Sequence, residues 1–212
     1  VCIRDRSCGM ACLDVIMRLV RPGECVIAGD DLYGGSNRLL ELLKKQMHIE
    51  VDNIDTTDLV AVEQALQQRA KAHAAGEGAR VALVLLESPT NPMIKIADLA
   101  GCTRLVRKYI PEALVVVDNT MLSPYLMRPL EFGVDIVYHS ATKYLSGHHD
   151  IMAGVISCNR DDLAESMFFT IKSVGNALSP HDCFLLLRGV KTLALRMDRQ
   201  QTSAMQVATY LE

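Results

Sequence analysis

The sequence has 212 residues, of which 50% are hydrophobic and 22% are charged, with a formal net charge of −3. This composition is typical of a globular domain, and without a basic patch we expect no nucleic-acid partner. The longest apolar stretch covers residues 81–86 and is too short to cross a bilayer, so no membrane partner is expected.

Seven cysteines are present and none forms a CxxC pair, so we interpret them as reduced and mostly buried in an intracellular protein. Cys8 and Cys12 would lie one helical turn apart, but no second pair of ligands accompanies them. His148, His149 and Asp150 form another polar group, which favours loop residues beside a pocket over metal ligands. The sequence therefore predicts no metal site.

Helical and strand-like segments alternate along the chain, which predicts an α/β domain with a mainly parallel sheet. Strands are predicted at 24–29, 49–54, 80–87, 113–119, within 134–143, and at 151–157. Helices are predicted at 10–20, 39–47, from 59 onward, near 97–109, at 161–173, and from about 180 to the end. Residues 67–80 are polar and rich in alanine and glycine, and we expect a fraying helix end and a surface loop there.

Polar side chains follow four of the predicted strands at the point where each strand ends. In chain order they are Asp31 and Tyr33, then Glu87 and Asn91, then Asp118, then Ser140 to Lys143. In open α/β sheets, ligands bind beyond the carboxyl ends of the strands. The sequence therefore predicts a ligand site at this edge of the sheet.

Asp118 and Lys143 gain meaning when they are considered together. Alone, Asp118 is explained as a helix cap or loop residue, and Lys143 as a solvated side chain. A pyridoxal phosphate (PLP) site requires a lysine for the aldehyde, an acid for the pyridine nitrogen, and donors for the phosphate. Ser140 and Thr142 can supply hydroxyl donors beside that lysine.

Two further segments supply the remaining parts of such a site. Gly9 and Met10 open a predicted helix, whose unpaired N–H groups and positive dipole end suit a phosphate. Tyr33 precedes two glycines and offers a flat ring to stack on a pyridine, with the glycines allowing close approach. A nucleotide-binding protein is the weaker alternative, because neither GxGxxG nor GxxxxGK[ST] occurs.

Longer segments resemble the Cys/Met-metabolism family of PLP-dependent enzymes, which are the fold-type I transsulfuration enzymes. They are DDLYGGSNR at 30–38, LESPTNP at 86–92, the run from VVVDNT to HSATKYLSGH at 115–148, and SPHDCFLLLRGVKTLALRM at 179–197. The resemblance runs from about Gly9 to the last residue. Within the family, the combination is most similar to plant-type cystathionine β-lyases, with γ-lyases and γ-synthases close behind.

The resemblance implies a role for each matching residue. Lys143 matches the lysine that bonds the cofactor aldehyde and then moves the Cα proton, and Asp118 matches the partner of the pyridine nitrogen. Tyr33 matches the tyrosine that stacks on the ring and takes part in acid–base chemistry, and Asn91 matches an asparagine near the phenolic oxygen. The implied phosphate ligands are the backbone N–H groups of Gly9 and Met10 and the hydroxyls of Ser140 and Thr142.

The resemblance also implies a fold and an activity. The fold would be the PLP-dependent transferase fold type I large domain, with a seven-stranded, mainly parallel sheet flanked by helices. Residues 1–212 would form this PLP-binding large domain incompletely, with an N-terminal segment before residue 1 and a small C-terminal domain after residue 212. The activity would be a carbon–sulfur lyase of methionine biosynthesis that converts cystathionine to homocysteine, pyruvate and ammonia.

Several alternatives stay open. The family also contains γ-lyases and γ-synthases, and the chain could instead be a non-catalytic truncated fragment. Family members assemble as dimers or tetramers, so a homo-oligomer is implied. The cytoplasm is the default location, and a plastid is the alternative if the protein is plant-like.

Two departures from the family pattern stand at the N-terminal end. Cys8 occupies the position where the family usually has serine. Residues 3–6 read IRDR, where an apolar strand is implied, which predicts a divergent or wrongly assigned start.

Overall fold

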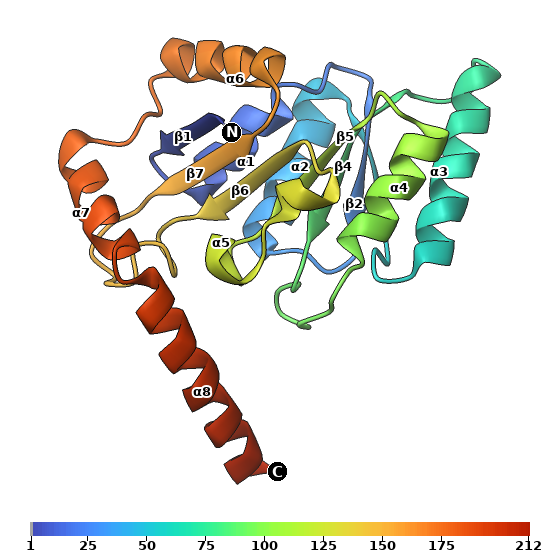
Figure 1. The fold of residues 1–212 in the computed structure, drawn as a ribbon. Coiled ribbons are helices and arrows are strands. Elements are labelled where there is room, and N and C mark those ends of the chain that lie inside the picture. The colour runs from blue at the N-terminus through green and yellow to red at the C-terminus, as the bar shows by residue number, and fades with distance from the viewer. Residues whose placement is uncertain (1) are drawn as a thin grey trace.

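A seven-stranded sheet forms the centre of the molecule in the computed structural model, which describes residues 2–212 (Figure 1). The strands are β1 (Cys2–Arg6), β2 (Cys25–Gly29), β3 (Glu50–Ile54), β4 (Val81–Glu87), β5 (Leu114–Asp118), β6 (Ile136–Ser140) and β7 (Gly154–Cys158). Their order is β1-β7-β6-β5-β4-β2-β3. Within the described residues, β7 pairs antiparallel with β1 and β6, and the other four strand pairs are parallel, so the sheet is mainly parallel, as predicted.

Helices cover both faces of the sheet. They are α1 (Gly9–Met17), α2 (Gly34–Met47), α3 (Leu59–Ala74), α4 (Leu99–Tyr109), α5 (Ser123–Leu126), the 3-10 helix η1 (Pro129–Phe132), α6 (Asp161–Val174), α7 (Pro180–Val190) and α8 (Leu193–Leu211). One hydrophobic core joins α1, α2 and α6 to one face of the sheet. A second core joins α3 and α4 to the other face.

The strand β4 shows why its sequence is almost continuously apolar. All seven of its residues are buried. Leu83 and Leu85 pack into the first core, whereas Val84 and Leu86 pack into the second. Because side chains alternate across a strand, a sheet covered on both faces requires apolar residues at successive positions.

Three local predictions differ from the structure. The helix α3 continues to Ala74, well past the predicted fraying point at residue 67. Asp58 caps its first turn by accepting the Val60 N–H at 2.8 Å, and Arg69 pairs with Asp52 across to β3. The last predicted helix divides into α7 and α8, and α8 extends away from the sheet (Figure 1). The short helices α5 and η1 were not predicted.

The charged segment at the start is an edge strand. β1 pairs antiparallel with β7, with Arg6 opposite Gly154. The Asp5 carboxylate accepts the Leu178 N–H at 3.3 Å and the Cys183 thiol at 3.7 Å. The Asp5 carboxylate therefore contacts the start of α7 and the residue that leads into it, and the strand forms despite the charged residues that made it hard to predict.

Within residues 2–212, none of the helices combines the length and apolar character needed to cross a lipid bilayer. Each of the seven cysteines carries a free thiol, and those of Cys12, Cys25, Cys102 and Cys158 are buried. This agrees with the prediction that most of the cysteines are buried.

Candidate active site

A cavity of about 200 Å³ opens at the carboxyl ends of the parallel strands. Its lining includes all eight residues singled out from the sequence, which are Gly9, Met10, Tyr33, Asn91, Asp118, Ser140, Thr142 and Lys143. The structure therefore brings together residues from five separate segments, which the sequence placed at strand ends or at the start of a helix. Their individual roles remain predictions.

The strand register explains this convergence. Glu87 lies opposite Asp118 in the β4–β5 pair, and Asp118 lies opposite Tyr138 in the β5–β6 pair. Parallel strands that end in register deliver their last side chains to one edge of the sheet. Ser140 ends β6, and Lys143 follows in a turn in which its N–H donates to the Ser140 carbonyl at 3.1 Å.

The amino end of α1 forms one wall of the cavity. Cys8 caps this helix, and its sulfur accepts the Ala11 N–H at 3.4 Å. At Gly9, a Cβ atom would lie 2.8 Å from the Cβ of Ser140, so only glycine allows this close approach. The approach sets unpaired helix N–H groups beside the end of β6, which is an arrangement suited to an anion.

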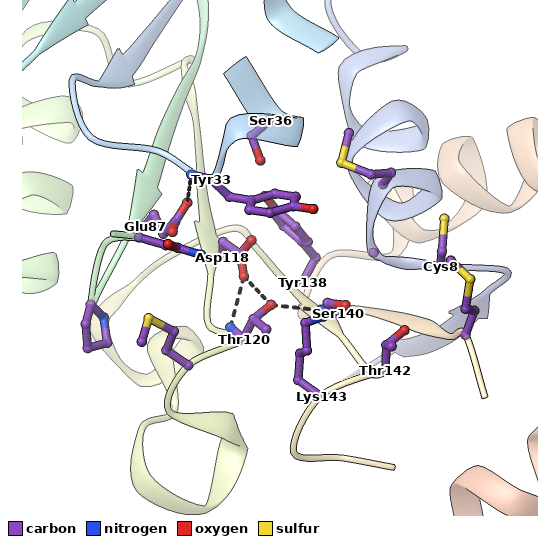
Figure 2. A pocket seen from close by; sticks show the side chains of 16 residues that line it. Cys8, Tyr33, Ser36, Glu87, Asp118, Thr120, Tyr138, Ser140, Thr142 and Lys143 are labelled. Carbon is purple, nitrogen blue, oxygen red and sulfur yellow. Dashed lines mark hydrogen bonds between the residues drawn. The ribbon is translucent and has the colours of Figure 1, made fainter. Parts of the chain in front are cut away.

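Tyr33 forms another wall. It immediately precedes α2, and its side chain is 50% exposed. A Cβ at Gly35 would lie 2.5 Å from the Tyr33 ring, so the glycine gives the ring room to lie flat across the cavity. Figure 2 shows this ring beside Asp118 and Tyr138.

Asp118 is the buried acid of the site. Burial raises the pKa of its carboxyl, and hydrogen bonds from Thr120 and Tyr138 oppose that rise. The Thr120 hydroxyl and N–H donate to the carboxylate at 2.5 and 2.9 Å, and the Ser140 N–H donates to the same hydroxyl at 2.8 Å (Figure 2). A cation or N–H donor in the cavity would stabilise the ionised carboxylate.

Lys143 and Thr142 lie at the mouth of the cavity. The Lys143 side chain extends from its loop toward the interior (Figure 2). The Thr142 hydroxyl donates to the Ala153 carbonyl at 3.2 Å and accepts the Ala153 N–H at 3.0 Å. This exchange fixes the Lys143 loop to the chain that leads into β7, and Thr142 as a phosphate ligand stays a prediction.

Sequence reasoning did not assign four polar residues of the lining, which are Ser36, Glu87, Thr120 and Tyr138. Glu87 was recognised at a strand end, but without a role. Thr120 could have been found from VDNT, because a threonine two residues after an aspartate can bond its carboxylate. The strand pairing that places Tyr138 beside Asp118 is not visible in the sequence.

The cavity fits PLP by the chemistry of its donors. It offers a primary amine, a buried carboxyl, a flat aromatic ring and a helix terminus for an anion, from Lys143, Asp118, Tyr33 and Gly9. A side chain at Gly9 would collide with Ser140, so the glycine lets the amino end of α1 approach the end of β6, where its N–H groups suit a phosphate.

Fold and cavity together define an α/β domain of the class that binds a phosphorylated pyridine cofactor through a lysine. The sequence matches the family described as Cys/Met metabolism PLP-dependent enzyme over residues 5–212. The chain belongs to this family, and the family prediction is confirmed.

Named relatives agree with this assignment. The chain is 52% identical to cystathionine beta-lyase of Neurospora crassa, over 97% of this chain and 43% of the relative. It is 50% identical to cystathionine beta-lyase of Schizosaccharomyces pombe, over 97% of this chain and 50% of the relative. The crystal structure of metB from Corynebacterium glutamicum superimposes with a TM-score of 0.90 at 35% identity, over 99% of this chain and 51% of that one. The fold prediction is thus confirmed, and the chain spans about half the length of these relatives.

Proposed function

We propose that this chain is the PLP-binding large domain of a carbon–sulfur lyase that cleaves cystathionine by β-elimination. The observation that carries the proposal is the convergence of Lys143, Asp118 and Tyr33 on one cavity. With one water molecule, cystathionine would yield homocysteine, pyruvate and ammonia. The Cβ–S bond breaks, its electron pair leaves with the sulfur, and water replaces the nitrogen of the three-carbon fragment.

Lys143 would hold the cofactor and then move the proton. Its Nζ would hold the cofactor by the aldehyde and, once an amino-acid substrate is bound, the free Nζ would accept the Cα proton of that substrate. Bound PLP withdraws electrons from the Cα of an amino acid, which makes that proton removable. Nζ is then placed to return a proton to the departing sulfur.

The other residues would bind and orient. Asp118 would keep a proton at the pyridine nitrogen, because the ionised carboxylate is stabilised by a protonated ring. The Tyr33 ring would cover one face of the pyridine, and Asn91 would lie near the phenolic oxygen. The phosphate would lie at the amino end of α1, held by the backbone of Gly9 and Met10 with Ser140 and Thr142 beside it.

The β-lyase reaction is favoured over the γ-reactions by the relatives. Those named cystathionine beta-lyase in Neurospora crassa and Schizosaccharomyces pombe are 52% and 50% identical, whereas cystathionine gamma-lyase of Bacillus subtilis is 38% identical. A γ-lyase would release cysteine and 2-oxobutyrate from the same substrate, and a γ-synthase would form cystathionine. The substrate is therefore an amino acid in each case.

Domain organisation, assembly and location complete the proposal. Residues 1–212 correspond to about half of each relative, and we propose that a segment before them and a small domain after them make up the rest. We propose a homo-oligomer, a dimer or tetramer. The cytoplasm is the proposed default location, with a plastid as the alternative because one relative from Arabidopsis thaliana is described as chloroplastic.

Visible absorption of the chain after addition of PLP and removal of the excess tests the proposal. A band above 400 nm that is lost in Lys143→Ala is expected, followed by pyruvate and homocysteine from cystathionine. 2-Oxobutyrate and cysteine would assign a γ-lyase instead. A bound cofactor without any product would identify a non-catalytic fragment, and no bound cofactor in a folded chain would contradict the site.

A further inference from the structure

Glu87 carries a buried carboxyl in the cavity, and the proposed reaction assigns it no role. It ends β4, its residue is 5% exposed, and it lines the cavity. It lies opposite Asp118 in the strand pair, so two carboxyl groups end neighbouring strands at the same site. A carboxyl is retained in such a place only when its hydrogen bonds offset the cost of burial.

Those hydrogen bonds come from two residues predicted to touch the cofactor. The Tyr33 N–H donates to Oε2 of Glu87 at 3.0 Å (Figure 2). The backbone N–H of Asn91 donates to the same carboxyl. Tyr33 follows β2 and Asn91 follows β4, so the Glu87 side chain contacts two separate loops at the rim of the cavity.

The Tyr33 backbone is held at two points: its carbonyl accepts the Ser36 and Asn37 N–H groups of α2 at 2.8 and 3.2 Å, and its N–H donates to Glu87. Tyr33 is the cap residue of α2, yet its side chain forms no capping hydrogen bond with that helix. Its ring is half exposed and contacts glycine backbone at Gly35. The bond from its own N–H to Glu87 therefore fixes the backbone from which the ring projects.

The groups around Glu87 make its charge sensitive to pH. Burial raises the pKa of its carboxyl to about 7, the N–H groups of Tyr33 and Asn91 oppose that rise, and the negative charges of Asp118 and Asp31 add to it. Tyr138 on β6 also faces this charge, and Lys143 lines the same cavity. An ionised acceptor forms a hydrogen bond roughly twice as strong as a neutral one.

We propose that Glu87 is a positioning residue: its ionised carboxylate holds Tyr33 and Asn91 in place around the cofactor, and its protonation loosens both. The hydrogen-bond part concerns this chain alone, whereas the effect on the cofactor rests on the function proposed above. In this proposal Glu87 acts through Tyr33 and Asn91.

The hydrogen bonds are tested without any cofactor. Amide ¹H–¹⁵N signals of Tyr33 and Asn91 are followed from pH 5.5 to 8.5 by NMR. We expect both to shift with one shared midpoint near pH 7, and to lose that transition in Glu87→Gln. Glu24→Gln is the matched control, since Glu24 is also buried and accepts a backbone N–H, from Arg21 at 2.8 Å, outside the cavity lining. Signals that stay flat in the unaltered chain, or that titrate alike in Glu87→Gln, would overturn the proposal.

The positioning effect is tested with PLP. Glu87→Gln is expected to bind PLP about tenfold more weakly, the size of one hydrogen bond to a charged group, while Glu24→Gln binds it normally. The visible circular dichroism of the bound cofactor should change between pH 6 and 8 in the unaltered chain and stay constant in Glu87→Gln. If Glu87→Gln and the unaltered chain bind PLP with the same affinity and show the same dichroism, Glu87 has no positioning role. If the amide signals of Tyr33 and Asn91 titrate as expected but the unaltered chain binds no PLP, the proposed function is wrong and the inference about the hydrogen bonds still holds.

Discussion

Replacing Glu87 by glutamine should change how the stability of the chain without cofactor depends on pH. Glutamine keeps the shape of the side chain and an acceptor oxygen, but it removes the charge. The ordinary pKa of the glutamate carboxyl is 4.5, and burial raises it to about 7 in the folded chain. Between these two values the folded state holds a proton that the unfolded state has lost.

The sign follows from this difference in bound protons. Because the folded state binds more protons in that window, the free energy of unfolding falls as pH rises from 4.5 to 7. The two pKa values differ by about 2.5, and at about 1.4 kcal/mol for each the loss is roughly 3 kcal/mol. For a chain of this length, that corresponds to a change in melting temperature of about 6 to 12 °C.

Urea denaturation of the chain and of Glu87→Gln at several pH values between 4 and 8 measures this effect. The difference between the two proteins removes contributions from groups that they share, including His139. Relative to the variant, the unaltered chain should lose roughly 3 kcal/mol of unfolding free energy across the window. A difference that stays constant with pH, or that grows in favour of the unaltered chain as pH rises, would refute the reasoning about this buried carboxyl.

The remaining predictions concern three other positions. In His139→Gln the sign reverses, because burial lowers the pKa of His139 from 6.5 to about 4. As pH falls through that window, the free energy of unfolding of the unaltered chain should fall by roughly 3 kcal/mol relative to that of the variant. Equal losses for the two proteins in denaturant melts would contradict this. Gly9→Ala sets a Cβ 2.8 Å from that of Ser140, so denaturation should show a loss of about 1–3 kcal/mol in the free energy of unfolding, and PLP titration should show weaker binding. Unchanged values would mean that the residues of this cavity wall move apart at little cost. Cys8→Ser should raise the free energy of unfolding by about 0.5–1 kcal/mol, because a hydroxyl caps a helix better than a thiol that accepts the Ala11 N–H at 3.4 Å. A loss of stability would argue against this cap.

The sequence was sufficient for the sheet and for the edge at which the site lies. Continuous apolar runs such as 81–86 identify strands covered on both faces, and polar residues at strand ends identify the ligand edge. β1 was harder to predict. Asp5 and Arg6 are charged, which suits neither a buried strand nor the alternation of apolar and polar residues expected of a half-buried one. The contacts that make it acceptable come from the chain around Leu178, more than 170 positions away.

The unassigned residues of the site show the same limit. Tyr138 and Glu87 act beside Asp118 through the pairing of neighbouring strands, and register is decided by contacts between distant segments. Helix ends were missed for a different reason. Polar residues after Leu66 weaken the apolar pattern, although capping and ion pairs let α3 continue to Ala74.

The scattered origin of the cavity has a consequence for how the chain reaches its folded state. Its lining spans residues 8 to 152, and β1 finds its partner only when β7 is in place. Parallel strands need long crossovers, so many contacts join residues far apart in the sequence and chain closure is slow. Capture of PLP during refolding would therefore report that these distant segments have come together, and a chain interrupted before Met152 would lose that residue and the partner of β1 together.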